Sequence, residues 1–111
     1  MRNVILYLKD ILDAMVAIEN FVKGIDFEEF KSNDLVSSGV IRKFEIIGEA
    51  AKNIPEEITG KYPNIPWKRM AGMRDRLIHF YFGVKYELVW DTIKKEIPKL
   101  KSSMQKVLKD L

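Results

Sequence analysis

Apolar residues recur at intervals of three and four along most of this chain, and this spacing limits its possible folds more than any other feature. In residues 3–23 the repeating positions are Val4, Leu8, Ile11, Met15, Ile18 and Val22. Residues spaced in this way share one face of an α-helix. The spacing returns further along at Val40, Phe44, Ile47, Ala51 and Ile54. No segment shows the strict alternation of a half-buried strand, so we expect an all-α fold.

Glycine and proline mark where the first helices end. Gly24 is expected to end the first helix, and a second helix is expected from about Asp34 to Ile54, which a proline follows. Residues 26–33 connect the two and have room for one short helical turn. Residues 55–66 hold three of the four prolines, which predicts a loop with room for one short turn.

The remaining sequence predicts two further helices. The third is expected from Trp67 to Phe82, with Gly83 as its stop, and the fourth from about Tyr86 toward the C-terminus. Pro98 interrupts the fourth, where we favour a kinked continuation over a new helix. Four or five helices with short connections predict an up-and-down bundle forming one domain over residues 1–111.

Composition narrows the classes of function. The chain has no cysteine, which excludes disulfides, thiolate metal sites and cysteine nucleophiles and fits a cytoplasmic protein. Charges interrupt the N-terminal apolar residues too soon for a signal peptide, and no apolar run approaches a membrane span, so no membrane association is expected. A net charge of +3 is compatible with nucleic acid without requiring it. His79 is the single histidine, so one chain cannot build a zinc site from several histidines or a two-histidine acid–base pair.

His79 falls in the expected third helix, away from its core stripe. On a helix turning about 100° per residue, His79 projects outward between Gly72 and Gly83, which leave the imidazole approachable. Asp75 lies four residues earlier, where its carboxylate can hydrogen-bond a ring nitrogen. A lone histidine is more often a satisfied core or surface residue, but the outward direction argues against a core position. The stripe itself is formed by Met70, Met73, Leu77, Phe80 and Val84.

Two further features of this helix favour a partner. Arg74 diverges from His79 by about 140° on an ideal helix, so a shared ligand requires its long side chain or a symmetric partner. Ile78 and Phe82 make a second apolar strip, for another helix of the chain or a second subunit. Arg69 and Arg76 are the nearest additional candidates for contacts with phosphate.

The stretch from Arg74 to Tyr81 resembles the R-x4-H-x-Y signature of HepT-like toxins in the HEPN superfamily. The resemblance extends in the right order over nearly the whole chain, through residues 47–51, 65–67, 72–74, 81–84 and 89–90. It implies a metal-independent endoribonuclease, a toxin that works as a homodimer with the motif helices meeting at a cleft. It also implies a nucleotidyltransferase antitoxin of the MntA type that transfers AMP to the motif tyrosine.

Carried onto this chain, the resemblance makes Arg74 and His79 the catalytic pair and Tyr81 the site of AMPylation. Asp75 and Arg76 are expected to support them, with no metal or other cofactor. The expected partners are RNA, a second copy of the chain and the antitoxin. Asp75 departs from the family, which commonly has asparagine there, and it adds a negative charge beside a site meant for phosphate.

The residue types fit this chemistry independently of the resemblance. Metal-free RNA cleavage needs a base for the 2′-hydroxyl proton, an acid for the leaving oxygen and a cation for the phosphorane. Histidine titrates near neutral pH, and arginine presents a fixed fork of donors to phosphate. One histidine cannot easily serve both proton transfers, whereas a two-fold dimer supplies two.

Blander interpretations remain for this chain and for several of its residues. The alternative function is a non-catalytic nucleotide- or substrate-binding subunit of the nucleotidyltransferase, and a third is a purely structural dimer. Glu45 and Glu49 are expected to have structural or surface roles, and Trp67 and Trp90 to be core or interface anchors. The C-terminal lysines are expected to form a solvated helix face; they are Lys94, Lys95, Lys99, Lys101, Lys106 and Lys109.

Overall fold

The computed structural model describes residues 2–79 and 83–111, and of Arg2, Ile78 and His79 it describes the backbone alone. Helices account for most of these residues, which confirms the all-α class. In chain order the elements are α1 (Arg2–Phe21), α2 (Phe27–Ser32), α3 (Asp34–Lys52), α4 (Glu56–Thr59), α5 (Trp67–Ala71), α6 (Met73–Leu77), β1 (Ile78–His79), β2 (Gly83–Val84), α7 (Tyr86–Asp91), the π-helical turn η1 (Thr92–Glu96) and α8 (Ile97–Asp110).

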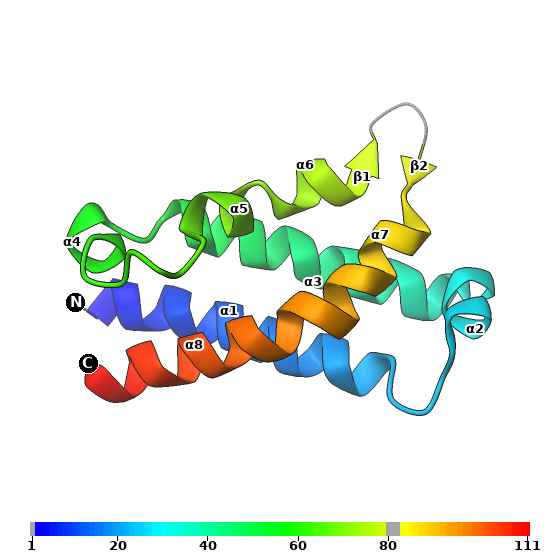
Figure 1. Ribbon diagram of the computed structural model, residues 1–111, viewed down its shortest axis with the longest axis horizontal. Coiled ribbons are helices and arrows are strands. Elements are labelled where there is room, and N and C mark those ends of the chain that lie inside the picture. The colour runs from blue at the N-terminus through cyan, green and yellow to red at the C-terminus, as the bar shows by residue number, and fades with distance from the viewer. Residues whose placement is uncertain (1, 80–82) are drawn as a thin grey trace.

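The chain passes up and down the long axis of the molecule (Figure 1). α1 leads away from the end that holds both termini, and α3 returns beside it after the short α2. α5 and α6 lead outward again to the β1–β2 hairpin, and α7, η1 and α8 lead back. This arrangement confirms the expected up-and-down bundle. Among the described residues, no helix combines the length and the apolar character needed to cross a membrane.

The core lies where the apolar stripes of these passes meet. Every position of the two stripes predicted for the first and second helices is buried, from Val4 to Val22 and from Val40 to Ile54. Met70, Met73 and Leu77 of the third stripe are fully buried as well. Burying each large apolar side chain stabilises the fold by about 1.5–3 kcal/mol. The helical periodicity therefore located the core.

Side-chain caps fix where two of the helices start. The Asp26 carboxylate accepts a hydrogen bond from the Glu29 backbone N–H at 2.9 Å and so begins α2. The Asn33 side chain accepts one from the Val36 N–H at 3.1 Å and so begins α3. Each cap satisfies an N–H that has no partner within its own helix. The expected short turns are confirmed as α2 in the first connection and α4 in the second.

The fourth pass remains helical from Tyr86 to Asp110, which confirms the expected continuation through Pro98. The disturbance takes the form of a π-helical turn, in which the Ile97 N–H donates to the Thr92 carbonyl five residues earlier. On a regular α-helix, at about 100° per residue, Ile97 would lie about 80° around the axis from Val89. The wider turn keeps both residues in the core, where each is fully buried.

The third helix differs from the prediction. It breaks at Gly72, whose backbone leaves the helical region (φ −92°, ψ 9°), and it ends at Leu77 instead of continuing to Phe82. Ile78 and His79 form strand β1, which pairs antiparallel with Gly83 and Val84 of β2. The prediction of one continuous helix over Trp67 to Phe82 is therefore wrong.

Candidate active site

His79 lies in a strand, so the helical geometry predicted for it is wrong. Its backbone pairs with Gly83, and the hairpin is extended by a 3.0 Å hydrogen bond that the Lys85 N–H donates to the Leu77 carbonyl. The i, i+4 relation on which the expected Asp75–His79 hydrogen bond depended does not exist, because helix α6 ends between these two residues. Asp75 is exposed.

The sequence contained a signal for this hairpin. Residues 78–82 read Ile-His-Phe-Tyr-Phe, a run rich in β-branched and aromatic types that favour strands. Gly83 follows with φ +83°, in the left-handed region that glycine adopts without steric cost. The run of residues 78–82 also suited the helical spacing of the core stripe. Short apolar runs of this kind are compatible with the period of a helix and with that of a strand.

Three residues on which predictions depended lie outside the described part of the chain. They are Phe80 of the core stripe, the modification candidate Tyr81, and Phe82 of the second apolar strip. The side chains of Ile78 and His79 lie outside it as well. The directions predicted for these side chains from an ideal helix no longer apply, since the backbone on either side of residues 80–82 is extended and not helical.

The Arg74 side chain lies against α3. Its Nε atom is 3.7 Å from Glu45 Oε2, and its Nη1 atom is 3.4 Å from Asp75 Oδ1. Both distances are long for charge-assisted hydrogen bonds, so the two carboxylates attract the guanidinium without holding it tightly. With 43% of its side chain exposed, Arg74 remains accessible to a ligand.

Arg74 borders a recess of about 220 Å³ between α3 and the motif segment. Positive and negative side chains line it in equal numbers, so it carries no large net charge. The residues that line it are Arg42, Glu45, Gly48, Glu49, Lys52, Ala71, Arg74 and Asp75. Of the two carboxylates on α3, Glu45 has a structural partner, because it is paired with Arg74. Among the described residues, no group of three acidic or histidine side chains is placed to hold a metal ion.

Gly48 explains how α3 approaches the motif segment so closely. A Cβ atom at this position would lie 3.1 Å from the Ala71 backbone carbonyl, closer than nearly all real contacts of this kind. The absent side chain lets α3 pack directly against the end of α5. Gly48 thus allows the close approach that brings Arg74 near Glu45 of α3.

Arg76 points to the opposite side of α6. Its Nη2 atom lies 3.4 Å from Glu96 Oε2, and the same oxygen lies 3.0 Å from Nη2 of Arg69. Within the described residues, the Nε and Nη1 atoms of Arg76 are buried and have no hydrogen-bond partner. Both arginines that were expected to contact phosphate are therefore engaged by one carboxylate.

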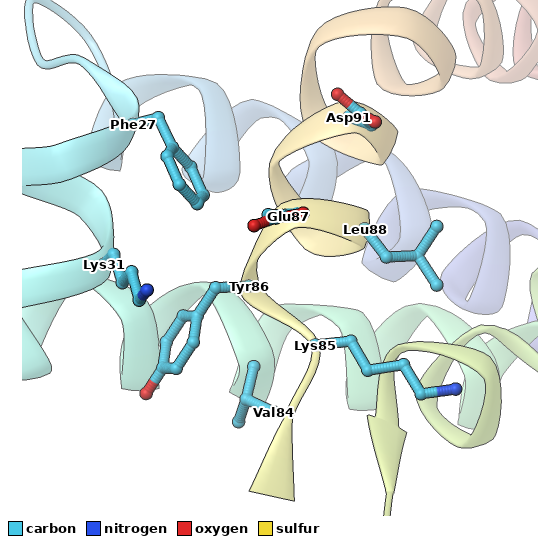
Figure 2. Close-up of a pocket in the computed structure, with 8 residues that line it drawn as sticks. All are labelled: Phe27, Lys31, Val84, Lys85, Tyr86, Glu87, Leu88 and Asp91. Atoms are coloured by element: carbon cyan, nitrogen blue, oxygen red, sulfur yellow. The ribbon is translucent and has the colours of Figure 1, made fainter.

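A second hollow, of about 520 Å³, lies beside the hairpin between α2 and α7. Figure 2 shows Lys31 and Phe27 reaching into it from α2, with the Tyr86 ring beside Lys31. Its lining is mixed in charge, because Glu87 and Asp91 accompany the lysines. This hollow lies next to the strand that pairs with His79.

The two tryptophans are core anchors, as expected. Trp67 is buried, and its Nε1–H donates to the Tyr62 carbonyl at 3.0 Å. Trp90 is half-buried and packs on the ring of Phe30, with 5.3 Å between the ring centroids. Lys94 lies over the Trp90 ring, 4.7 Å from its centroid.

The fold and the motif together define a small helical protein of the HEPN class, with its arginine at the end of the third pass and its histidine in the hairpin that follows. A model of the HepT-like ribonuclease family matches residues 11–107, and the chain belongs to that family. This confirms the expected resemblance, and with it the expectation of a ribonuclease.

The chain is also similar to several named proteins. It is 53% identical to "Putative RNase MJ0125" of Methanocaldococcus jannaschii over 110 residues, which cover 99% of this chain and 95% of that protein. It is 48% identical to "Probable ribonuclease HepT" of Thermococcus cleftensis over 103 residues, covering 93% and 94% of the two chains. No solved structure matched.

Proposed function

We propose that this ribonuclease cuts RNA without a metal ion, using Arg74 and His79 as its catalytic pair. The observation that carries the proposal is the accessible guanidinium of Arg74, which lies in the short helix directly before the strand of His79 in a chain of this family. A guanidinium offers two parallel donors to the oxygens of a phosphodiester.

The proposed reaction is an attack by the ribose 2′-oxygen on the adjacent phosphorus. A bond forms between phosphorus and O2′, and the bond between phosphorus and O5′ breaks. A histidine base takes the 2′-hydroxyl proton, and a histidinium acid gives a proton to O5′, so the products are a 2′,3′-cyclic phosphate and a 5′-hydroxyl. Arg74 stabilises the charge on the non-bridging oxygens of the phosphorane.

The proton transfers favour a homodimer. Each chain has one histidine, and a two-fold pair of chains brings a second one to the same cleft. One imidazole then serves as base while its partner serves as acid. Arg76 is mostly buried against Glu96, whereas Arg74 keeps 43% of its side chain exposed in the helix directly before the hairpin, so Arg74 is the motif arginine that we assign to the phosphate.

The proposed cellular role is that of a cytoplasmic toxin neutralised by a nucleotidyltransferase of the MntA type. The support is the motif itself, in which Tyr81 occupies the position that receives AMP in the HepT-like family. Addition of AMP would place a phosphate and a bulky nucleotide near the arginine that binds RNA.

A cleavage assay with a labelled single-stranded RNA tests the catalytic proposal. We expect activity to persist in EDTA, with 2′,3′-cyclic phosphate ends, and to fall about 10²–10³-fold in Arg74→Ala. Arg74→Lys keeps the charge but loses the fork, so it should recover only part of the rate. His79→Ala should remove about 10²–10⁴-fold. Lys109→Ala, an exposed change at the end of α8, serves as the control.

Two results would contradict the proposal. Loss of cleavage in EDTA with recovery in magnesium would mean a metal-dependent mechanism. RNA binding without any cleavage by the unmodified chain would favour the alternative, a non-catalytic substrate-binding subunit of the nucleotidyltransferase.

A further inference from the structure

We infer that Glu96 is a positioning residue for the motif arginine, acting through Arg76 and Arg69 from the π-helical turn of the fourth pass. The inference rests on the proposed role of Arg74. Glu96 is distant from the motif in sequence, and nothing in the R-x4-H pattern points to it. The Glu96 side chain is 25% exposed and links the fourth pass of the bundle to the third through its contacts with Arg69 and Arg76.

One carboxylate oxygen spans the break in the motif segment. Arg69 belongs to α5 and Arg76 to α6, with the non-helical Gly72 between the two helices. Oε2 of Glu96 lies 3.0 Å from the first arginine and 3.4 Å from the second. This shared contact therefore restrains the angle between α5 and α6, which the glycine alone would leave free.

The contact also restrains the rotation of α6 about its axis. α6 has five residues, so few of its own hydrogen bonds define its orientation. Met73 and Leu77 hold its inner face in the core. On one side the partly buried Arg76 contacts Glu96 at 3.4 Å, and on the other Arg74, two residues away and about 200° around the helix, faces α3.

Burial makes the Glu96–Arg76 contact hard to replace. Two nitrogens of the Arg76 guanidinium are buried without a partner among the described residues, so the carboxylate supplies the compensation for a desolvated cation. Without Glu96, Arg76 would be driven toward water, and α6 would turn with it. A misplacement of about 1 Å at a reacting group can cost as much as 10²-fold in rate.

The π-turn places the carboxylate at this position. Glu96 is the last residue of η1, and the Thr92, Ile93 and Ile97 side chains beside it are buried. A π-helical turn contains one residue more than an α-helical turn. The core residues before and after it therefore stay on one face of the helix, while Glu96 faces the motif segment. Extra turns of this kind are frequent at functional sites.

Steady-state kinetics of RNA cleavage by the full chain test the inference. Glu96→Gln keeps the shape of the side chain and removes its charge. We expect an about tenfold fall in kcat, with KM for RNA changed by less than about twofold, because the variant misplaces Arg74 without removing an RNA contact. Glu57→Gln, an exposed glutamate on α4, is the matched control and should cleave at the unmodified rate.

A double-mutant cycle separates positioning from general stability. Arg76→Met should show the same fall in kcat, and the double variant with Glu96→Gln should lose no more than either single change. Thermal melts should give melting temperatures well above the assay temperature for both single variants and the double variant. Activity that falls only in proportion to the unfolded fraction would overturn the inference in favour of a purely structural contact.

Other outcomes are equally decisive. A rise in KM for Arg76→Met would mean that Arg76 contacts RNA itself, and a faster Glu96→Gln variant would mean that the carboxylate masks phosphate-binding arginines; either result overturns positioning. If the unmodified chain cleaves RNA, Arg74→Ala is inactive and Glu96→Gln is unchanged, the inference fails while the proposed function stands. If the unmodified chain cleaves no RNA, both fail.

Discussion

At the scale of single residues, the two arginines of the signature have divided roles although they are only two positions apart. Arg74 remains accessible and is attracted weakly by Glu45 and Asp75. Arg76 is mostly buried and tied to Glu96. The difference follows from helical geometry, because residues two positions apart on an α-helix point about 200° apart around its axis. On residue type alone, both arginines would be expected to bind phosphate.

The residue-scale prediction concerns Tyr81. Tyr81→Phe removes only the hydroxyl, so it should fold normally, retain nuclease activity and take up no AMP from a cognate nucleotidyltransferase supplied with ATP. Intact mass after incubation measures the modification. Tyr86→Phe, a change at the nearby tyrosine that begins α7, is the matched control and should be modified like the unchanged chain. AMP-sized increments on Tyr81→Phe would place the acceptor elsewhere.

At the scale of elements, the hairpin is the feature that separates this site from a simple helical face. The motif arginine lies in α6 and the motif histidine in β1, so the two residues belong to different elements. The strand pairing fixes the backbone of His79 against Gly83. A change that disturbs β2 should therefore affect catalysis even though β2 carries no residue of the catalytic pair.

Gly83→Ala tests the contribution of the hairpin. The glycine has φ +83°, and a Cβ atom there would meet nothing within 4 Å, so the cost is conformational and not steric crowding. We expect a loss of about 1–2 kcal/mol in the free energy of unfolding, measured in urea, together with a clear fall in RNA cleavage. Unchanged cleavage would show that the pairing does not position His79.

Gly24→Ala provides the matched control for this experiment. Gly24 has φ +78° and also has open space around its Cβ position, but it lies in the connection after α1. Its replacement should cost a similar free energy of unfolding while leaving cleavage at the unmodified rate. A fall in activity common to both variants would reflect stability and not the hairpin.

At the scale of the whole molecule, the bundle leaves the motif end of the third pass at the periphery. The hairpin follows α6 and projects from the side of the bundle, toward the end of the molecule opposite the termini (Figure 1). A peripheral hairpin is available to a second copy of the chain, whereas a histidine buried within the bundle would not be. The proposed two-histidine chemistry thus depends on assembly as well as on fold.

The whole-molecule prediction is a homodimer whose contact includes Phe82. Light scattering should give twice the chain mass of 13.0 kDa at micromolar concentration. Phe82→Asp should shift the mass toward that of one chain and abolish cleavage, because it places a charge in an apolar interface. Leu35→Asp, at a leucine that is 85% exposed at the start of α3, is the control and should stay dimeric.

Subunit mixing tests the shared site even if Phe82→Asp does not fold. Arg74→Ala and His79→Ala chains, each inactive alone, are mixed and allowed to exchange. Partial recovery of cleavage is expected if each cleft draws residues from both chains. A monomeric mass for the unmodified chain, or no recovery after demonstrated exchange, would contradict the shared cleft.

The sequence by itself determined the class of the fold, the core and the family. Spacings of three and four residues are a direct consequence of helical geometry, so the stripes from Val4 to Val22 and from Val40 to Ile54 could be assigned without knowing what they pack against. The motif and its flanking segments identified the family in the same local way. Each of these depends on residues close together in the chain.

Tertiary structure decided the site. The apolar run from Ile78 onward fits either a helix or a strand, and the choice depended on pairing with β2 after the chain turned back. Arg76 contacts Glu96, 20 residues later, because the third and fourth passes pack against each other. Arg74 contacts Glu45 because α3 approaches the motif segment closely at Gly48. Such contacts depend on how the passes are set against one another, which local periodicity does not encode.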